Sequence, residues 1–198
     1  PYPHSENIPA GMSHEQYVEY CLWHLDSHIP EYIVPSENIA AVLIEPGLAE
    51  GGNWIPSGNF IKGIRKICDK HGWLMIADEV LTGLGRTAEM WGMDHYKVIP
   101  DMLIVGKNLS GGIAPCAGVA TRDEILGNNP SASSGSTFAG TPAGCAAGLK
   151  TLEIYKRDKV IDHAKKLAQI AKLRMEPWCE KYSVCLLYTS PSPRDNTT

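Results

Sequence analysis

Three short apolar runs, each followed closely by a polar or charged residue, constrain the fold of this chain most strongly. They cover residues 39–44, 73–77 and 102–105. Each has the length of a β-strand, and a helical pattern separates the first two. Such a strand–helix–strand order predicts an α/β fold with a mostly parallel sheet flanked by helices. Because the first run is apolar throughout, we expect that strand to be buried on both faces.

Four further segments carry apolar residues at helical spacing, and a fourth strand is expected at residues 117–120. Helices are predicted for residues 14–28 and for residues about 158–175. A third helix is predicted between Ser57, which can cap its start, and Gly72, which can end it. A fourth is predicted to begin at Pro142. Glycine-rich stretches, such as residues 79–87, are expected to be loops. No internal repeat interrupts this order.

Three charged side chains are predicted to meet at one edge of the sheet. Glu45, Asp78 and Lys107 each fall at or just past the end of an apolar run. Ligands of parallel α/β sheets bind beyond the carboxyl ends of the strands. An amine and a carboxylate there suggest a site for pyridoxal phosphate: Lys107 would form a Schiff base with the aldehyde, and Asp78 would keep the ring nitrogen protonated. Taken alone, either residue could instead be a turn cap or a solvated surface group.

Composition excludes several other classes of function. The chain has 198 residues, and its net charge of −4 gives no electrostatic reason to bind nucleic acid or an anionic membrane. No apolar run is long enough to span a bilayer. The six cysteines have no metal-ligand spacing, so no metal site is predicted. They are expected to be reduced thiols in a cytoplasmic protein.

Several motifs together resemble the class III pyridoxal-phosphate aminotransferases, the omega-aminotransferase family. They are residues 76–87, Pro100-Asp101, Gly106-Lys107, Gly111-Gly112, Glu45-Pro46, residues 50–52 and residues 135–142. The resemblance covers residues about 30–180. It implies the large domain of a fold-type-I pyridoxal-phosphate enzyme. It also implies transfer of an amino group from an amine or omega-amino acid to a 2-oxo acid.

The resemblance assigns roles to individual residues. It implies that Lys107 is the Schiff-base lysine and the base that moves the proton, that Asp78 is the partner of the ring nitrogen, and that Val80 packs on the face of the ring. Thr137 matches a threonine that reaches the cofactor phosphate of the neighbouring subunit, with Ser136 assisting, which implies a homodimer. Glu45 resembles a glutamate that gates the substrate pocket.

The resemblance also implies that the chain is an interior fragment of a longer enzyme, incomplete at both ends and inactive alone. Residues 1–150 are expected to form part of the cofactor-binding large domain, and residues 151–184 to be helices that lead into a small domain. Residues 185–198 break the helical pattern and resemble a translated sequencing adapter. We expect this tail to take no part in the fold.

Other interpretations remain open from the sequence. Within the same family, a racemase, an aminomutase or a decarboxylating aminotransferase would use the same lysine and aspartate. A nucleotide hydrolase would explain an apolar run ending in Asp78-Glu79, but Gly106-Lys107 lacks the rest of a phosphate-binding loop. A non-catalytic scaffold would have no reason to keep Asp78, Lys107 and Thr137 together.

Overall fold

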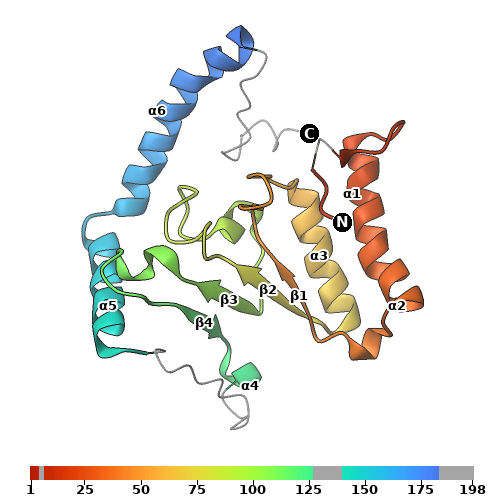
Figure 1. The fold of residues 1–198 in the computed structure, drawn as a ribbon, viewed down its shortest axis with the longest axis horizontal. Helices are drawn as coiled ribbons and strands as arrows, with labels where there is room; N and C mark the ends of the chain where they lie inside the picture. Colours follow the sequence, from red (N-terminus) through yellow and green to blue (C-terminus); the bar gives the residue numbers. More distant parts are fainter. Residues whose placement is uncertain (5–6, 127–139, 183–198) are drawn as a thin grey trace.

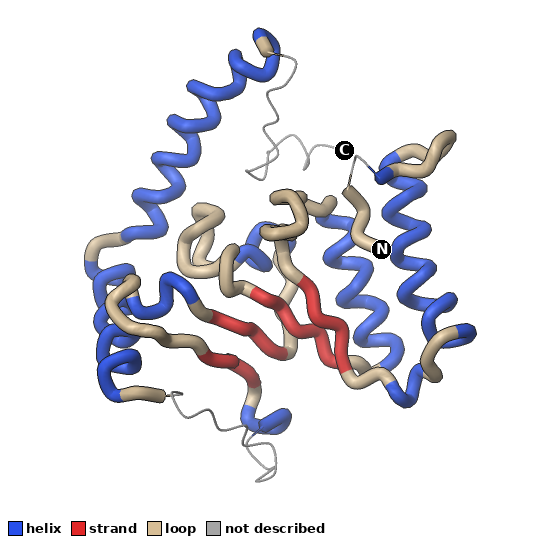
Figure 2. The backbone as a smooth tube through the Cα atoms, in the orientation of Figure 1, coloured by secondary structure: helices blue, strands red, loops and turns tan. Residues whose placement is uncertain are grey.

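The computed structural model describes residues 1–4, 7–126 and 140–182, and within them a four-stranded sheet lies at the centre. Figures 1 and 2 show this sheet with helices on its flanks. The strands follow one another across the sheet in the order β1-β2-β3-β4. They are β1 (Ala41–Ile44), β2 (Leu74–Asp78), β3 (Met102–Val105) and β4 (Gly118–Thr121). All four strands predicted from the sequence are present, each within two residues of its expected bounds.

The sheet is mixed but mostly parallel. β1 pairs with β2 and β2 with β3 in parallel, whereas β3 and β4 are antiparallel. The chain between β3 and β4 is short and holds only a 3-10 helix, Lys107–Ser110, so it cannot make the long crossover that a parallel pair requires. The single antiparallel pairing therefore follows from the length of the connection.

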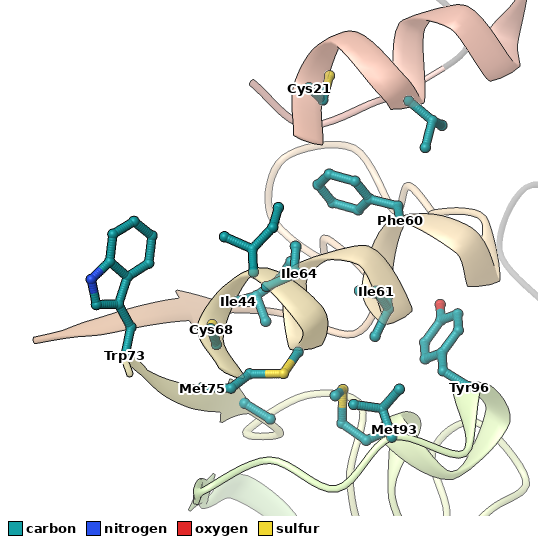
Figure 3. Packing of buried hydrophobic residues seen from close by; sticks show 14 of the residues in the cluster. Cys21, Ile44, Phe60, Ile61, Ile64, Cys68, Trp73, Met75, Met93 and Tyr96 are labelled. Atoms are coloured by element: carbon teal, nitrogen blue, oxygen red, sulfur yellow. The ribbon is translucent and has the colours of Figure 1, made fainter. Parts of the chain in front are cut away.

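One face of the sheet is packed against α3 (Gly58–His71). This helix starts after Ser57, although the Ser57 hydroxyl makes no hydrogen bond within the described residues, so the predicted side-chain cap is wrong. It ends at Gly72, which has a φ of 73°, as predicted. Figure 3 shows the apolar side chains of α3 between those of α1 and those of the sheet and the β2–β3 connection. The core consists mainly of Cys21, Ile44, Phe60, Ile61, Ile64, Cys68, Met75, Ala77, Met93 and Tyr96.

The opposite face of the sheet is more open. Ile44 is 8% exposed, yet its neighbour Leu43, which points the other way, is 61% exposed. Val119 of β4 lies on the same open face and is 50% exposed. The strand register shows this: Leu43 pairs with Ile76, which pairs with Met102. Ile104, two residues further along the same strand, pairs with Val119. The prediction that β1 is buried on both faces is therefore wrong for the described part of the chain, because α3 covers one face only.

The segment predicted as one helix over residues 14–28 is helical throughout, with a change of pitch. α1 (His14–Trp23) begins at a capping box formed by Ser13 and Gln16. A π-helical turn, His24–His28, follows, and α2 (Ile29–Tyr32) continues it. α1 packs on the outer side of α3, which makes a second helical layer at this end of the molecule (Figure 1).

The chain beyond β4 is mainly helical. A short helix, α4 (Asp123–Leu126), precedes α5 (Pro142–Arg157) and α6 (Val160–Lys181). α5 lies beside the turn that follows β3, and α6 projects away from the sheet (Figure 1). The apolar positions of these helices are largely exposed, for example Leu149 at 72%. That residues 151–184 lead into a second, small domain stays a prediction. In the described ranges, no helix is both long and apolar enough to cross a membrane.

Candidate active site

The carboxyl ends of β1, β2 and β3 lie at the same edge of the sheet because the three strands are parallel. Glu45 directly follows β1, Asp78 is the last residue of β2, and Lys107 lies two positions after the end of β3. Asp78 is paired in register with Ile104, three residues before Lys107. The structure thus places the predicted acid and amine at adjacent strand ends, although they are far apart along the chain.

Asp78 uses only part of its hydrogen-bonding capacity. Its Oδ1 accepts a hydrogen bond of 3.0 Å from the backbone N–H of Val80, which closes the turn after β2. Its other oxygen, Oδ2, has no hydrogen bond or ion pair with the described residues. One carboxylate oxygen of Asp78 therefore caps the turn after β2, and the other oxygen is available for a ligand.

Lys107 has an unusual backbone conformation and an unengaged side chain. Its φ is +45°, in the left-handed region that few residues other than glycine adopt. The residue is exposed, and its amine makes no ion pair or hydrogen bond within the described ranges. The turn behind it is held in place, since the buried Ser110 donates a hydrogen bond to the carbonyl of Ala114. Backbone strain of this kind is concentrated at functional sites.

Val80 follows the end of β2 and lies near the end of β3. A Cβ added at Gly106 would be 3.6 Å from each γ-carbon of Val80 and 3.7 Å from the Cβ of Ala117. The valine side chain therefore lies near the residue that precedes Lys107, and an added methyl group there would just reach it. It is partly exposed, so it presents an apolar surface at the site rather than filling the core.

Glu45 is partly buried, and one oxygen of its carboxylate is engaged in its own loop. Its Oε2 accepts a hydrogen bond of 2.9 Å from the backbone N–H of Ala49. Glu45 and Asp78 both line a cavity of about 340 Å³, together with Tyr2, His24, Leu48 and other residues. Lys107 does not line this cavity. The structure thus joins the two predicted carboxylates through one cavity and places the lysine outside it.

Glu79 is the site residue to which the sequence analysis gave no role. It is 1% exposed, and its two carboxylate oxygens accept three hydrogen bonds, from Thr82 Oγ1 at 2.5 Å, Gly92 N at 2.9 Å and Met93 N at 2.8 Å. The alternation of a strand is the signal that could have found it. If Asp78 faces the open side, the next residue faces the core, where a carboxylate needs donors.

The loop that follows Glu79 is also attached to the helices beyond β4. The Tyr155 hydroxyl donates a hydrogen bond of 2.8 Å to the carbonyl of Leu84, and Lys165 forms an ion pair of 2.7 Å with Glu89. A Cβ at Gly85 would lie 2.9 Å from the Cδ1 of Ile161. Residues on α5 and α6 therefore help to hold the loop that begins at the predicted site.

Two predicted site residues, Ser136 and Thr137, lie outside the described residues, so their roles at a cofactor phosphate stay predictions. Cys21, Cys68, Cys116 and Cys145 are free thiols. In the part of the chain that the structure describes, no cluster of three or more His, Cys, Asp or Glu side chains could hold a metal ion.

Parallel strand ends that present an unengaged lysine and an aspartate are the arrangement expected at a pyridoxal-phosphate site. The class III aminotransferase family model matches residues 2–186, so the chain belongs to the class III aminotransferases. One curated relative is the probable 4-aminobutyrate aminotransferase of Bacillus subtilis. It is 33% identical over 182 residues, which are 92% of this chain and 41% of the relative.

Solved structures agree with this assignment. An (S)-enantioselective omega-transaminase from Thermomicrobium roseum has a TM-score of 0.79 at 29% identity, over 90% of this chain and 40% of that one. The omega-transaminase of Pseudomonas jessenii, in complex with PMP, has a TM-score of 0.78 at 28% identity, over 89% and 40% of the two chains. The predicted fold class is confirmed. The chain spans between about a third and two fifths of the length of the relatives it matches.

Pyridoxal phosphate is the cofactor of this family, and the described residues fit it. Asp78 Oδ2 is available to accept a hydrogen bond from a ring nitrogen, the Lys107 amine is available for an aldehyde, and Val80 offers an apolar contact between them. These three groups come from adjacent strand ends and from the turn after β2. The chemistry of the donor set therefore agrees with the cofactor that the family uses.

Proposed function

We propose that the protein to which this chain belongs transfers an amino group from an amine or omega-amino acid to a 2-oxo acid, with pyridoxal phosphate as cofactor. The observation that carries the proposal is the placement of Asp78 and Lys107 at neighbouring strand ends, each with an unengaged polar group. The relatives support amino transfer over racemization or other reactions of the family, because their names are those of aminotransferases and transaminases.

The residues of the chain would divide the work as follows. Lys107 Nζ would hold the cofactor through its aldehyde and would take the proton from the substrate carbon that bears the amino group. Asp78 Oδ2 holds a proton on the ring nitrogen. Val80 orients the ring by contact with one face. When bound, the cofactor supplies the electron-withdrawing ring that stabilises negative charge on that carbon.

The remaining assignments extend this proposal beyond the described site. Glu45, at the cavity that it shares with Asp78, would gate the entry of substrate. Thr137 and Ser136 would contact the phosphate in a homodimer, with Thr137 serving the neighbouring subunit. The protein would work in the cytoplasm on small amines, amino acids and 2-oxo acids, and residues 151–184 would lead into the second domain.

Covalent trapping tests the proposal on the whole protein to which this chain belongs. We would incubate the protein with pyridoxal phosphate, reduce with borohydride, and measure the modification of each lysine by peptide mass spectrometry. Lys97 is a matched internal control, because it too is exposed and has a positive φ, of 55°. The proposal requires Lys107 to be modified at much lower cofactor concentrations than Lys97. Equal modification of the two lysines would refute it.

A further inference from the structure

The buried carboxylate of Glu79 is unusual because no cation accompanies it. Its side chain is almost fully buried, and within the described residues it forms no ion pair. Removing a carboxylate from water costs several kcal/mol unless hydrogen bonds compensate. Here they come from two backbone N–H groups and one hydroxyl. A residue placed only to fill this space could be apolar, so a different role has to be sought.

Every polar group of Glu79 is used, and the partners come from separate segments. Its backbone N–H donates to the carbonyl of Ile104 on β3 at 2.9 Å, and its carbonyl accepts from Gly83 N at 2.9 Å. Its carboxylate binds Thr82, Gly92 and Met93. Glu79 therefore joins the end of β2 to β3 on one side and closes the loop of residues 79–93 on the other.

The neighbours of Glu79 are residues of the candidate site. Asp78 precedes it and Val80 follows it, while Ile104, to which it is hydrogen-bonded, lies three residues before Lys107. The Val80 side chain also lies near Gly106, so the same two segments are close together at a second point. Any displacement of Glu79 would thus change where Asp78 lies relative to Lys107.

The surroundings of the carboxylate leave little room for displacement. A Cβ at Gly92 would lie 2.9 Å from the Cβ of Pro46, 2.9 Å from the Cβ of Thr82 and 3.1 Å from Glu79 Oε2. A Cβ at Gly83 would lie 2.7 Å from the Glu79 carbonyl. Close packing of this kind transmits a shift instead of absorbing it.

We propose that Glu79 is a positioning residue that sets the separation between Asp78 and Lys107. The proposal rests on the function proposed above, and it adds that the two reacting groups depend on a third side chain that touches neither the cofactor nor the substrate. The chemistry also explains why the residue is a glutamate. Three donors require two acceptor oxygens, and in glutamine the amide nitrogen would face a backbone N–H in either orientation.

The test is Glu79→Gln, with the trapping of Lys107 relative to Lys97 as its readout. Loss of a buried hydrogen bond should raise the cofactor concentration for half-modification of Lys107 roughly tenfold and leave Lys97 unchanged. Asp101→Asn is the matched control: Asp101 is a second carboxylate that accepts a hydrogen bond from a backbone N–H, but it is partly buried and lies at the opposite end of the sheet. It should lower stability without changing the ratio of Lys107 to Lys97.

Thr82→Val is the second variant, in case Glu79→Gln fails to fold. It removes a single donor to the carboxylate and should give a smaller change in the same direction. An unchanged ratio in Glu79→Gln or, if that variant does not fold, in Thr82→Val would overturn the proposal. An equal loss in Asp101→Asn would also overturn it, because the effect would then be a general weakening of the fold.

Amide hydrogen exchange separates this proposal from the proposed function. The Glu79 and Gly83 amides should exchange faster in Glu79→Gln than in wild type, with or without pyridoxal phosphate, whereas Asp101→Asn should accelerate the Met75 amide instead. Faster exchange at Glu79 and Gly83 together with equal modification of Lys107 and Lys97 in wild type would refute the proposed function and retain the positioning role. Unchanged exchange would refute the positioning role itself.

Discussion

Two aspartates at opposite ends of the sheet show how one residue type serves two purposes. Asp101, just before β3, accepts hydrogen bonds from Met75 N at 2.8 Å, Arg65 Nη1 at 2.7 Å and Arg122 Nη2 at 2.9 Å. Asp78, at the end of β2, accepts one hydrogen bond in the described structure and leaves Oδ2 unengaged. The side chain of Asp101 is 12% exposed.

The comparison shows that one end of the sheet stabilises the fold, whereas the other end leaves polar side chains free to bind a ligand. At the Asp101 end, carboxylate, guanidinium and backbone groups satisfy one another and connect β2, β3, β4 and α3. At the Asp78 end, the side chains that could react are left without protein partners. Next to Asp78, the backbone of Glu79 is hydrogen-bonded to β3, and the Glu79 carboxylate has its own protein partners.

The largest expected effect is the loss of covalent attachment in Lys107→Ala. The amine is the only group at its position that can bond to an aldehyde, so borohydride trapping at residue 107 should disappear. Residual modification elsewhere should match that of the wild type. Lys97→Ala is the control and should leave the trapping of Lys107 intact. A variant without Lys107 that still bound the cofactor as tightly, as measured by equilibrium dialysis, would contradict the assigned role.

The comparison itself is tested by the same isosteric change at each end. Asp101→Asn should lower the free energy of unfolding by about 1–3 kcal/mol, because it weakens a partly buried, charge-assisted network. Asp78→Asn should change it by less than about 0.5 kcal/mol, since asparagine can still accept the hydrogen bond from Val80 N. Chemical denaturation of the two variants measures both values. If Asp78→Asn lowers the free energy of unfolding more than Asp101→Asn does, the assignment of a stabilising role to Asp101 and of a ligand-binding role to Asp78 is wrong.

Acid should remove the contribution of Asp101. Burial acts to raise the pKa of this carboxyl, but hydrogen bonds from Met75 N, Arg65 and Arg122 outweigh it and hold the pKa below the ordinary value of 3.8. A depressed folded-state pKa means that the stabilisation is fully present above about pH 3.8 and is lost as the pH falls through the folded-state value. The difference in unfolding free energy between wild type and Asp101→Asn should therefore shrink in that window.

Denaturation of both proteins from neutral pH downward measures this dependence. The subtraction of the variant removes the contribution of other carboxylates, such as Asp26, whose pKa the hydrogen bonds from Lys70 and His71 also lower against the effect of burial. A difference that stays constant down to the lowest pH at which both proteins fold would show that the network does not depend on the ionised carboxylate.

The parts of the fold that the sequence predicted are those that short segments determine. Met102–Val105 is apolar, short and followed at once by glycine, so its bounds were predicted without error. Gly72 could be predicted to end α3 because glycine readily adopts the left-handed backbone conformation that commonly ends a helix. Asp78 and Lys107 could be placed at one edge because parallel strands share the direction of their carboxyl ends.

The parts that the sequence did not predict depend on segments that meet only in the fold. The donors to Glu79 come from Gly92 and Met93, and those to Asp101 come from α3, β2 and the residue after β4. The exposure of Leu43 depends on what covers the second face of the sheet, which no pattern within β1 reports. The π-helical turn at His24–His28 likewise leaves no mark in the apolar spacing.

The smaller effects concern how tightly the backbone beneath the site is packed. Gly92→Ala would bring a methyl group to 2.9 Å from carbons of Pro46 and Thr82 and to 3.1 Å from the Glu79 carboxylate. These neighbours are buried and cannot move freely, so we expect a loss of about 1–3 kcal/mol in the free energy of unfolding. Thermal or chemical denaturation measures it, and a neutral substitution would show that the Glu79 region is looser than the structure indicates.

Gly106→Ala is the control for this packing effect and has the smallest expected consequence. The added methyl group would lie 3.6 Å from the γ-carbons of Val80, which is an ordinary van der Waals distance. Gly106 also has an extended backbone, with a φ of −169°, so alanine adopts it without strain. We therefore expect a change within about 0.5 kcal/mol. Gly92 lies near the Glu79 carboxylate and Gly106 near Val80, so a large loss at Gly106 would show that the region around Val80 is packed as tightly as the region around Glu79.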